Sequence, residues 1–177
     1  MSTATCNPAS PYEYFEGTWQ QLFLWLDEST PVRSGISEEL LDAGGRRADG
    51  PYAIRHKGWF DAPADGVYTF HAPGPKYEMD ELNLEHGFDL SLWIDGEEWY
   101  QATGRHAFGT WSVPLARGAH TLKIVYVDFR GGKPDQYTAT VEFGTEWDGD
   151  VPTLNVSGPG MPIGPIPSSL LGVADGI

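Results

Sequence analysis

The sequence predicts an all-β fold, an antiparallel β-sandwich, and three observations point to it. Its 177 residues include 22 glycines and 14 prolines, well above the average combined share of about an eighth. Aromatic residues are also dense, with 8 Phe, 8 Tyr and 7 Trp. Many turn formers together with many aromatics favour short strands over long helices. The third observation is a repeated alternation of apolar and polar residues in the second half of the chain.

The alternation locates the strands and the tight turns between them. Residues 52–60 and 67–71 flank the Asp65-Gly66 pair, which suits a hairpin because Asp-Gly tolerates positive φ. Residues 88–94 alternate cleanly and end at a second Asp-Gly turn, Asp95-Gly96. Further strands are expected at residues 12–15, 99–100, 110–115, 122–126, 137–143 and 151–156. Residues 19–26 are apolar without a clear period, and their conformation stays open.

The chain divides into an arm, one sandwich and a tail. Residues 1–10 are small and polar and are expected to form an N-terminal arm. Residues 11–156 form the sandwich, long enough to bury a core without disulfides. Residues 157–177 begin with a run of prolines and glycines, which lack donors and resist regular pairing. We therefore expect an extended C-terminal tail that lies against the sandwich, with Leu170 and Leu171 docked at its end.

Charge and motif content exclude several functions. With 11 basic and 25 acidic residues, the net charge is −14, which repels phosphate backbones and anionic lipid. Neither a nucleic-acid partner nor a membrane span is expected, since no stretch approaches the ~18 apolar residues that a span needs. Cys6 is the only cysteine, so no disulfide forms within the chain. No nucleophile elbow, phosphate-binding loop or zinc motif occurs, and the sequence is expected not to be an enzyme.

Several segments, in order, resemble the PA14 module, a β-sandwich found in anthrax protective antigen, yeast flocculins and bacterial glycosidases. Residues 58–70 (GWFDAPADGVYTF) resemble its opening, residues 92–96 (LWIDG) its central strand and turn, and residues 113–126 (VPLARGAHTLKIVY) its later hairpin. The flanking segments 12–19, 30–32, 158–160 and 165–167 are similar to the form attached to bacterial glycoside hydrolases. The resemblance covers about residues 10–172 and implies a carbohydrate-binding role.

The resemblance also bears on calcium. Sugar-binding members of the family hold Ca²⁺ with two adjacent aspartates just before the central strand, and Gly87 and Phe88 stand there in this sequence. The family's calcium pair is therefore absent. A substitute cation site is predicted at Asp80, Glu81 and Asp89, because Ca²⁺ takes six to eight oxygen ligands and this segment is rich in carboxylates. The alternative is a solvated acidic loop.

Aromatic side chains near turns are the candidates for sugar contact. Trp99, Tyr100 and Trp111 are predicted to bind carbohydrate, because a rigid aromatic plane gives contact area at low entropic cost. The alternative is that each of them fills the sandwich core. Trp93 falls on the strand face opposite Leu92 and Ile94, so it either packs under another element or is exposed.

Two functional hypotheses follow. The first is a non-catalytic carbohydrate-binding or adhesion module that recognises surface glycans or polysaccharide. The second is a structural accessory (decoration) subunit of a phage virion or extracellular filament, anchored to neighbouring subunits through its termini. Residues 1–6 carry neither the basic region nor the apolar run of a secretory signal, which a virion protein does not need. Either hypothesis places the protein outside the cell or on a virion surface.

Overall fold

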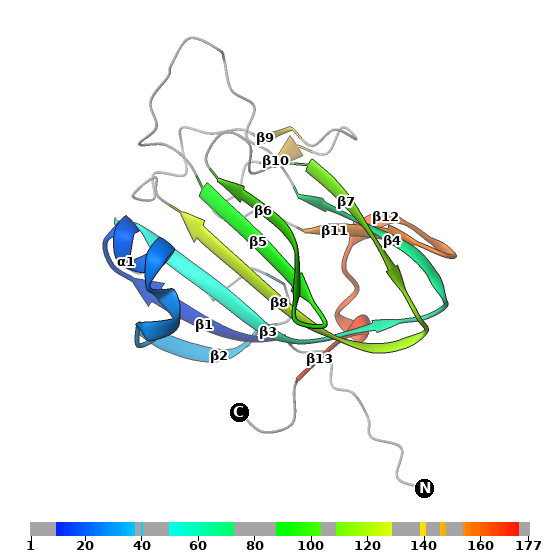
Figure 1. The fold of residues 1–177 in the computed structure, drawn as a ribbon, viewed down its shortest axis with the longest axis horizontal. Coiled ribbons are helices and arrows are strands. Elements are labelled where there is room, and N and C mark those ends of the chain that lie inside the picture. The colour runs from blue at the N-terminus through cyan, green and yellow to red at the C-terminus, as the bar shows by residue number, and fades with distance from the viewer. Residues whose placement is uncertain are drawn as a thin grey trace, which may run out of the picture.

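The computed structural model contains two antiparallel sheets packed face to face (Figure 1). It describes residues 10–37, 40, 50–72, 88–103, 109–128, 139–140, 146–147 and 154–173. The predicted all-β sandwich is confirmed. The predicted N-terminal arm lies outside the described residues except for Ser10, which is the first residue of the first strand.

The large sheet has the order β2-β1-β3-β8-β5-β6, and β13 also pairs with β3. Its strands are β1 (Ser10–Glu16), β2 (Arg33–Ser37), β3 (Tyr52–Ala62), β5 (Phe88–Ile94), β6 (Glu97–Thr103), β8 (Gly118–Asp128) and β13 (Leu171–Val173). The small sheet has the order β12-β11-β4-β7. Its strands are β4 (Gly66–Ala72), β7 (Gly109–Leu115), β11 (Asn155–Gly158) and β12 (Met161–Pro165). A separate pair joins β9 (Ala139–Thr140) to β10 (Glu146–Trp147).

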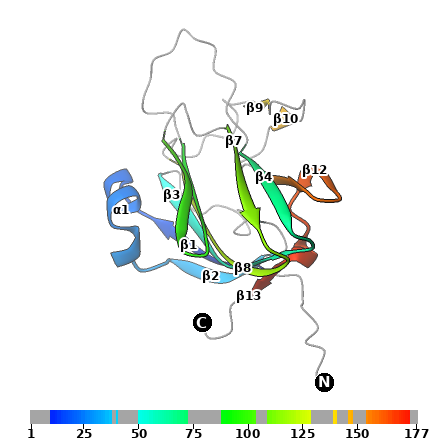
Figure 2. The same cartoon turned by 45° about the vertical axis from the view of Figure 1, so that its right-hand side comes forward.

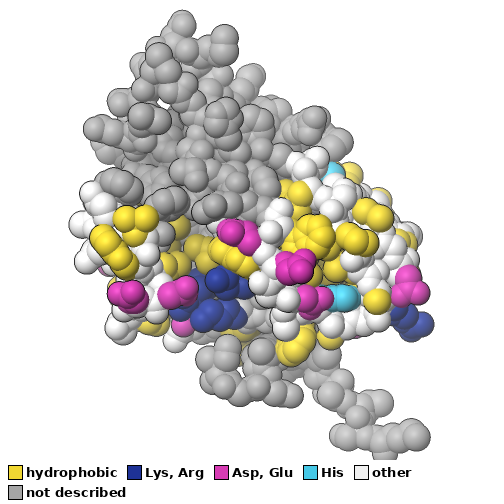
Figure 3. Space-filling view, viewed as in Figure 1, with side chains coloured by type: hydrophobic (Ala, Val, Ile, Leu, Met, Phe, Trp, Pro, Cys, Tyr) yellow, Lys and Arg dark blue, Asp and Glu magenta, His cyan; other side chains and the backbone are white. Residues whose placement is uncertain are grey.

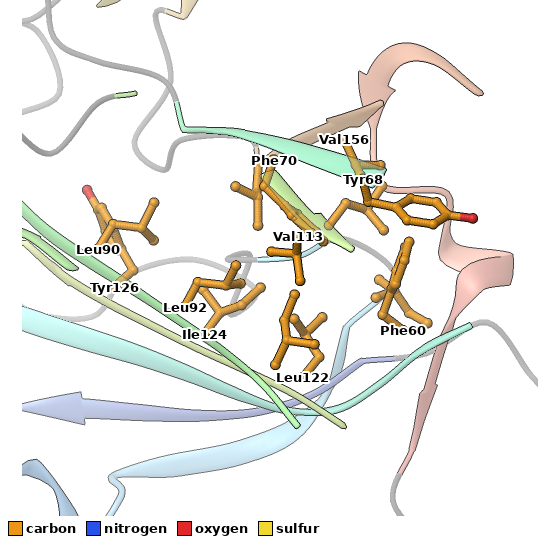
Figure 4. Close-up of a cluster of buried hydrophobic side chains, with 14 of the residues drawn as sticks. Phe60, Tyr68, Phe70, Leu90, Leu92, Val113, Leu122, Ile124, Tyr126 and Val156 are labelled. Atoms are coloured by element: carbon orange, nitrogen blue, oxygen red, sulfur yellow. The ribbon is translucent and has the colours of Figure 1, made fainter. Parts of the chain in front are cut away.

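The core lies between the two sheets and follows from the alternation in the sequence. Leu90, Leu92 and Ile94 point inward from β5, and Leu122 and Ile124 point inward from β8. Figure 4 shows these side chains directed toward Phe70, Val113 and Val156 of the small sheet. Because side chains of a strand alternate between faces, every inward residue has outward neighbours. The outward neighbours of β3, β5 and β8 form the outer face of the large sheet.

A short helical segment covers one part of that outer face. Helix α1 (Trp19–Leu24) is followed by the 3-10 helix η1 (Leu26–Glu28), and in Figure 2 α1 lies on the side of the large sheet away from the small sheet. Thr18 and Gln21 form a capping box that fixes the start of α1. The segment buries Leu22 and Leu26 in a second hydrophobic cluster with Phe15, Ala53 and Val127. The rest of the outer face has no such cover among the described residues.

The prediction that prolines and glycines keep residues 157–167 out of the ladder is wrong. Strands β11 and β12 form a hairpin across a turn in which Gly160 has φ +71°, and β11 pairs with β4. Strand β12 is at the edge of the small sheet, where proline is tolerated because one side of the strand needs no donor. Leu171 is buried, and Leu170 packs against the core. The 3-10 helix η4 (Ser168–Leu170) leads into β13.

The other strand predictions agree with the structure where it describes them. Only Ala139–Thr140 of the predicted strand 137–143 falls within the described residues. Among the described residues, no helix is long and apolar enough to span a membrane.

Candidate functional site

A row of three outward side chains crosses the middle of the large sheet. Lys57 of β3 pairs directly with Lys123 of β8, and Lys123 pairs in turn with Trp93 of β5. Their inward neighbours Leu92, Leu122 and Ile124 are buried, so alternation places the row on the outer face. The row therefore combines two ammonium groups and one indole on a single surface.

The row borders a hollow in the surface. Lys123 places its Nζ atom 3.8 Å from the centroid of the Trp93 ring, which is a cation–π contact. A hollow of about 430 Å³ is lined by the row together with Gly58, Gly96, Thr121 and Leu122. Figure 3 shows a group of Lys and Arg side chains beside hydrophobic side chains on this face of the molecule. The hollow thus offers apolar contact and positive charge together.

A second hollow adjoins the first. It has a volume of about 360 Å³ and lies between the α1–η1 segment and the sheet, and Trp93 and Lys123 line it as well. Its other walls include Trp25, Asp27 and Ser91. The side chain of Trp25 is 49% exposed. We refer to the two hollows together as the outer-face groove.

A buried arginine holds the wall of the outer-face groove in place. Arg55 donates from Nε to Glu13 Oε2 and from a terminal nitrogen to Asp27 Oδ1, each at 2.6 Å. Burial alone would raise the pKa of Glu13, but the hydrogen bond and charge of Arg55, with a contribution from Lys57, hold that pKa below its ordinary value. Asp27 belongs to η1, so this network fastens η1 to β1 and β3.

A β-bulge in β6 leaves Trp99 unpaired opposite Trp93. Strand β6 pairs Tyr100 with Leu92 and Glu98 with Trp93, which leaves Trp99 as the extra residue. Two residues of β6, Glu98 and Trp99, therefore oppose Trp93. The Trp99 side chain is 36% exposed. Trp99 lines neither hollow, and it is in the strand next to Trp93, at the edge of the large sheet.

The other two predicted residues occupy different surroundings. Tyr100 is in β6 opposite the inward Leu92, and its side chain is outside the described part of the structure. Trp111 is in β7 of the small sheet, where its ring stacks on Phe70 with centroids 6.0 Å apart and an interplanar angle of 16°. Trp111 also packs against the main core. The structure therefore does not bring Trp111 together with Trp99.

The predicted cation site falls mostly on residues that the structure does not describe. Asp80 and Glu81 lie outside the described residues. Asp89 is placed in β5 by its backbone pairing with Val127, and its side chain is not described. Among the described residues, no cluster of three His, Cys, Asp or Glu side chains is close enough to hold a metal ion.

Sequence reasoning noticed Trp93 but did not select it, and it missed the lysines. The signal was present, because Lys57 and Lys123 occupy outward positions in two predicted strands. Their pairing in one row depends on β3 being adjacent to β8, which the alternation does not reveal. Trp25 was also missed, because it belongs to residues 19–26, for which the sequence predicts no conformation.

No protein-family model matches this sequence, and no curated protein sequence matches it. Solved structures do match. An anti-sigma factor domain-containing protein from Clostridium clariflavum aligns with a TM-score of 0.60 and 18% identity over 93% of this chain and 47% of its own. The chain spans about half the length of that protein and of a second anti-sigma factor domain-containing protein.

Two PA14 domains match over nearly their whole length. The PA14 sugar-binding domain from an RTX adhesin has a TM-score of 0.61 and 12% identity, covering 94% of this chain and 98% of its own. The PA14 domain of the antifreeze protein MpAFP has a TM-score of 0.58 and 10% identity, covering 98% of this chain and 94% of its own. The chain therefore has the fold of a PA14 domain.

Proposed function

We propose that this chain is a non-catalytic carbohydrate-binding module that acts outside the cell and binds sugar in the outer-face groove. The observation that carries the proposal is the hollow of about 430 Å³ that Trp93 lines on the outer face of the large sheet, where no other described segment covers it. The fold supports it, since one domain of the same fold is described as sugar-binding and comes from an adhesin.

The groove has the chemistry that a sugar ring needs. One face of a pyranose presents C–H groups, which pack against an indole plane, while its hydroxyls require hydrogen-bonding partners. Trp93 and Trp25 supply indole surface in the groove, and Trp99 lies across the strand pair from Trp93. Thr121 lines one hollow, and Ser91 and Asp27 line the other, so hydroxyl and carboxylate groups are within the same site.

The remaining predicted contacts are separate proposals. Tyr100 belongs to the same strand as Trp99, and we keep it as a second sugar contact at the sheet edge. Trp111 would bind sugar only away from the outer-face groove, on a ring that already stacks on Phe70. Calcium held by Asp80, Glu81 and Asp89 would make binding sensitive to chelators. The decoration-subunit hypothesis depends on residues 1–10 and 157–177 and stays a prediction.

A glycan array tests the proposal, probed with the wild-type protein, with Trp93→Ala and with Trp111→Ala. Each protein is applied once with Ca²⁺ and once with EDTA. We expect wild type and folded Trp111→Ala to bind the same glycans, and Trp93→Ala to lose about tenfold in affinity. Absence of any glycan binding by the wild type would overturn the proposed function. Unchanged binding by Trp93→Ala would overturn the assignment to the outer-face groove.

A further inference from the structure

We propose that the sugar bound in the outer-face groove is acidic, and that its carboxylate or sulfate group binds between Lys57 and Lys123. This inference rests on the proposed carbohydrate-binding function and deepens it by naming the ligand class.

The two lysines form an unfavourable pair in the absence of a ligand. Lys57 and Lys123 are directly opposite each other in the β3–β8 ladder, and like charges in that position repel. The arrangement is unexpected in a chain with only 11 basic residues against 25 acidic ones. With carboxylates so abundant, a purely structural site would more readily place an acid opposite a lysine.

Nearby carboxylates do not resolve the repulsion. Glu13 Oε2 is 3.6 Å from Lys57 Nζ, but the same oxygen accepts a 2.6 Å hydrogen bond from Arg55. Within the described residues, no carboxylate oxygen lies within 4.0 Å of Lys123 Nζ, whose close neighbour is the Trp93 ring. The side chain of Lys57 is 43% exposed. An anion in the hollow would therefore meet two ammonium groups, of which only Lys57 has a carboxylate oxygen within 4.0 Å among the described residues.

The geometry allows one sugar unit to use both kinds of group. Lys57, Lys123 and Trp93 all line the same hollow of about 430 Å³, which is in the size range of small-molecule sites. A ring stacked on Trp93 would direct an equatorial acidic substituent toward the lysines. Lys123 rests on the Trp93 ring by a cation–π contact, which is weak at exposed sites, and its flexible stem lets the ammonium move to the ligand's anion.

The surroundings favour a sugar over a polyphosphate. Asp27 and Glu28 line the far side of the groove, and Glu97 and Glu98 are exposed on the neighbouring strand. A nucleic acid places a charge at every phosphate and needs several cations along its path. This face offers two lysines inside an acidic rim, which suits a saccharide with isolated charges and free hydroxyls between them.

Isothermal titration calorimetry with matched ligands tests the inference. The probes are an oligogalacturonate, its neutral methyl ester and a chondroitin sulfate oligosaccharide, with single-stranded DNA as a fourth ligand. The proteins are wild type, Lys57→Gln, Lys123→Gln and Trp93→Ala. Arg117→Gln is the charge-matched control, because it removes the same charge from an exposed position in the turn between β7 and β8 that lines neither hollow.

We expect an acidic sugar to bind the wild type at least tenfold more tightly than the methyl ester does. Each lysine variant should bind that acidic sugar with an affinity about tenfold lower than the wild type. Arg117→Gln should bind like the wild type, and raising the salt concentration should weaken acidic binding only. The carboxylated and sulfated probes decide which anion is preferred. Melting temperatures of the lysine variants should not fall, because each substitution removes the repulsive pair.

Each contrary result has a distinct meaning. Equal binding of the acid and its methyl ester, unaffected by Lys57→Gln and Lys123→Gln, would overturn the acidic ligand and leave carbohydrate binding intact. Lysine-dependent binding of DNA that exceeds binding of every sugar would overturn the saccharide assignment. Binding of no sugar, acidic or neutral, would overturn this inference together with the proposed function.

Discussion

At the residue scale, the turn between β5 and β6 shows how one side chain joins two hairpins. Asp95 has a positive φ of 53°, and its Oδ1 accepts a 3.0 Å hydrogen bond from the Thr121 backbone. Its Oδ2 is 2.7 Å from His120 Nδ1, and His120 Nε2 is 2.8 Å from the Ala116 carbonyl oxygen. A carboxylate and a carbonyl only accept, so both ring nitrogens donate and His120 is a cation when both bonds form.

This pair predicts a pH dependence of stability. Burial alone would lower the pKa of His120, but its hydrogen bonds to Asp95 and Ala116 raise that pKa above the ordinary 6.5. The stability that protonated His120 contributes to the folded state is therefore fully present below pH 6.5. It is lost as the pH rises through the raised pKa of His120. Urea denaturation of wild type and His120→Gln from pH 5 to 9 should show their stabilities converging at high pH. A constant difference across this range would contradict the assignment.

The stability from the Asp95–His120 pair is also lost at low pH. Burial would raise the pKa of Asp95, but the hydrogen bonds from His120 and Thr121 outweigh it and lower that pKa below its ordinary 3.8. Stability from Asp95 is present above pH 3.8 and is lost as the pH falls through the lowered pKa. Asp95→Asn should therefore lose less stability relative to wild type at pH 2 than at pH 5, measured by thermal unfolding.

At the element scale, strand β13 can dock on β3 only because residue 58 has no side chain. A Cβ atom at Gly58 would overlap the backbone carbonyl oxygen of Gly172 in β13, the residue that precedes Val173, the pairing partner of Gly58. Gly58→Ala should destabilise the protein by about 1–3 kcal/mol through this overlap. Gly50→Ala is the matched control, since a Cβ there meets nothing within 4 Å. Equal stability of the two variants would show that β13 does not pack as described.

A second prediction at this scale concerns Arg55, whose hydrogen bonds connect η1 to β1 and β3. Arg55→Ala removes the partner of Glu13 and Asp27 and a cation that lies 5.0 Å from the Phe15 ring centroid. We expect a loss of about 1–2 kcal/mol in unfolding free energy, because the hydrogen bond of the buried guanidinium to the part-buried Glu13 is lost, while the exposed Asp27 returns to water. Arg117→Ala, at an exposed position, should change stability by less than about 0.5 kcal/mol. A neutral effect of Arg55→Ala would contradict the network.

Individual elements also show which parts of the fold can be predicted from the sequence. Strands β3, β4, β5, β7 and β8 were predictable because alternation and Asp-Gly turns are local signals. Helix α1 was missed although its capping box, Thr18 and Gln21, is visible in the sequence, because the apolar run 19–26 masks the helical period. Strand β12 was excluded on its prolines, which an edge position tolerates. Whether a strand is at an edge depends on the whole sheet and not on local sequence.

At the scale of the whole molecule, the candidate site arises from strand order. Lys57, Lys123 and Trp93 are far apart in the sequence and become one row only because β3, β8 and β5 are neighbours. Trp99 was selected from its position near a turn, and it is the extra residue of the bulge in β6, the strand next to Trp93. Trp111 was selected on the same argument and instead stacks on Phe70 between the sheets. Residue type suggested aromatic contacts, but only the topology shows which aromatics share a face.

The most direct test of the central claim, sugar binding in the outer-face groove, is an NMR titration that follows the indole N–H signals of the seven tryptophans. Each signal is assigned by a Trp→Phe substitution, and the titrant is the oligogalacturonate or the glycan identified by the array. We predict that the Trp93 signal shifts most, with smaller shifts for Trp25 and Trp99 and none for Trp111. Saturating ligand that shifts Trp111 and leaves Trp93 unchanged would contradict the proposed site.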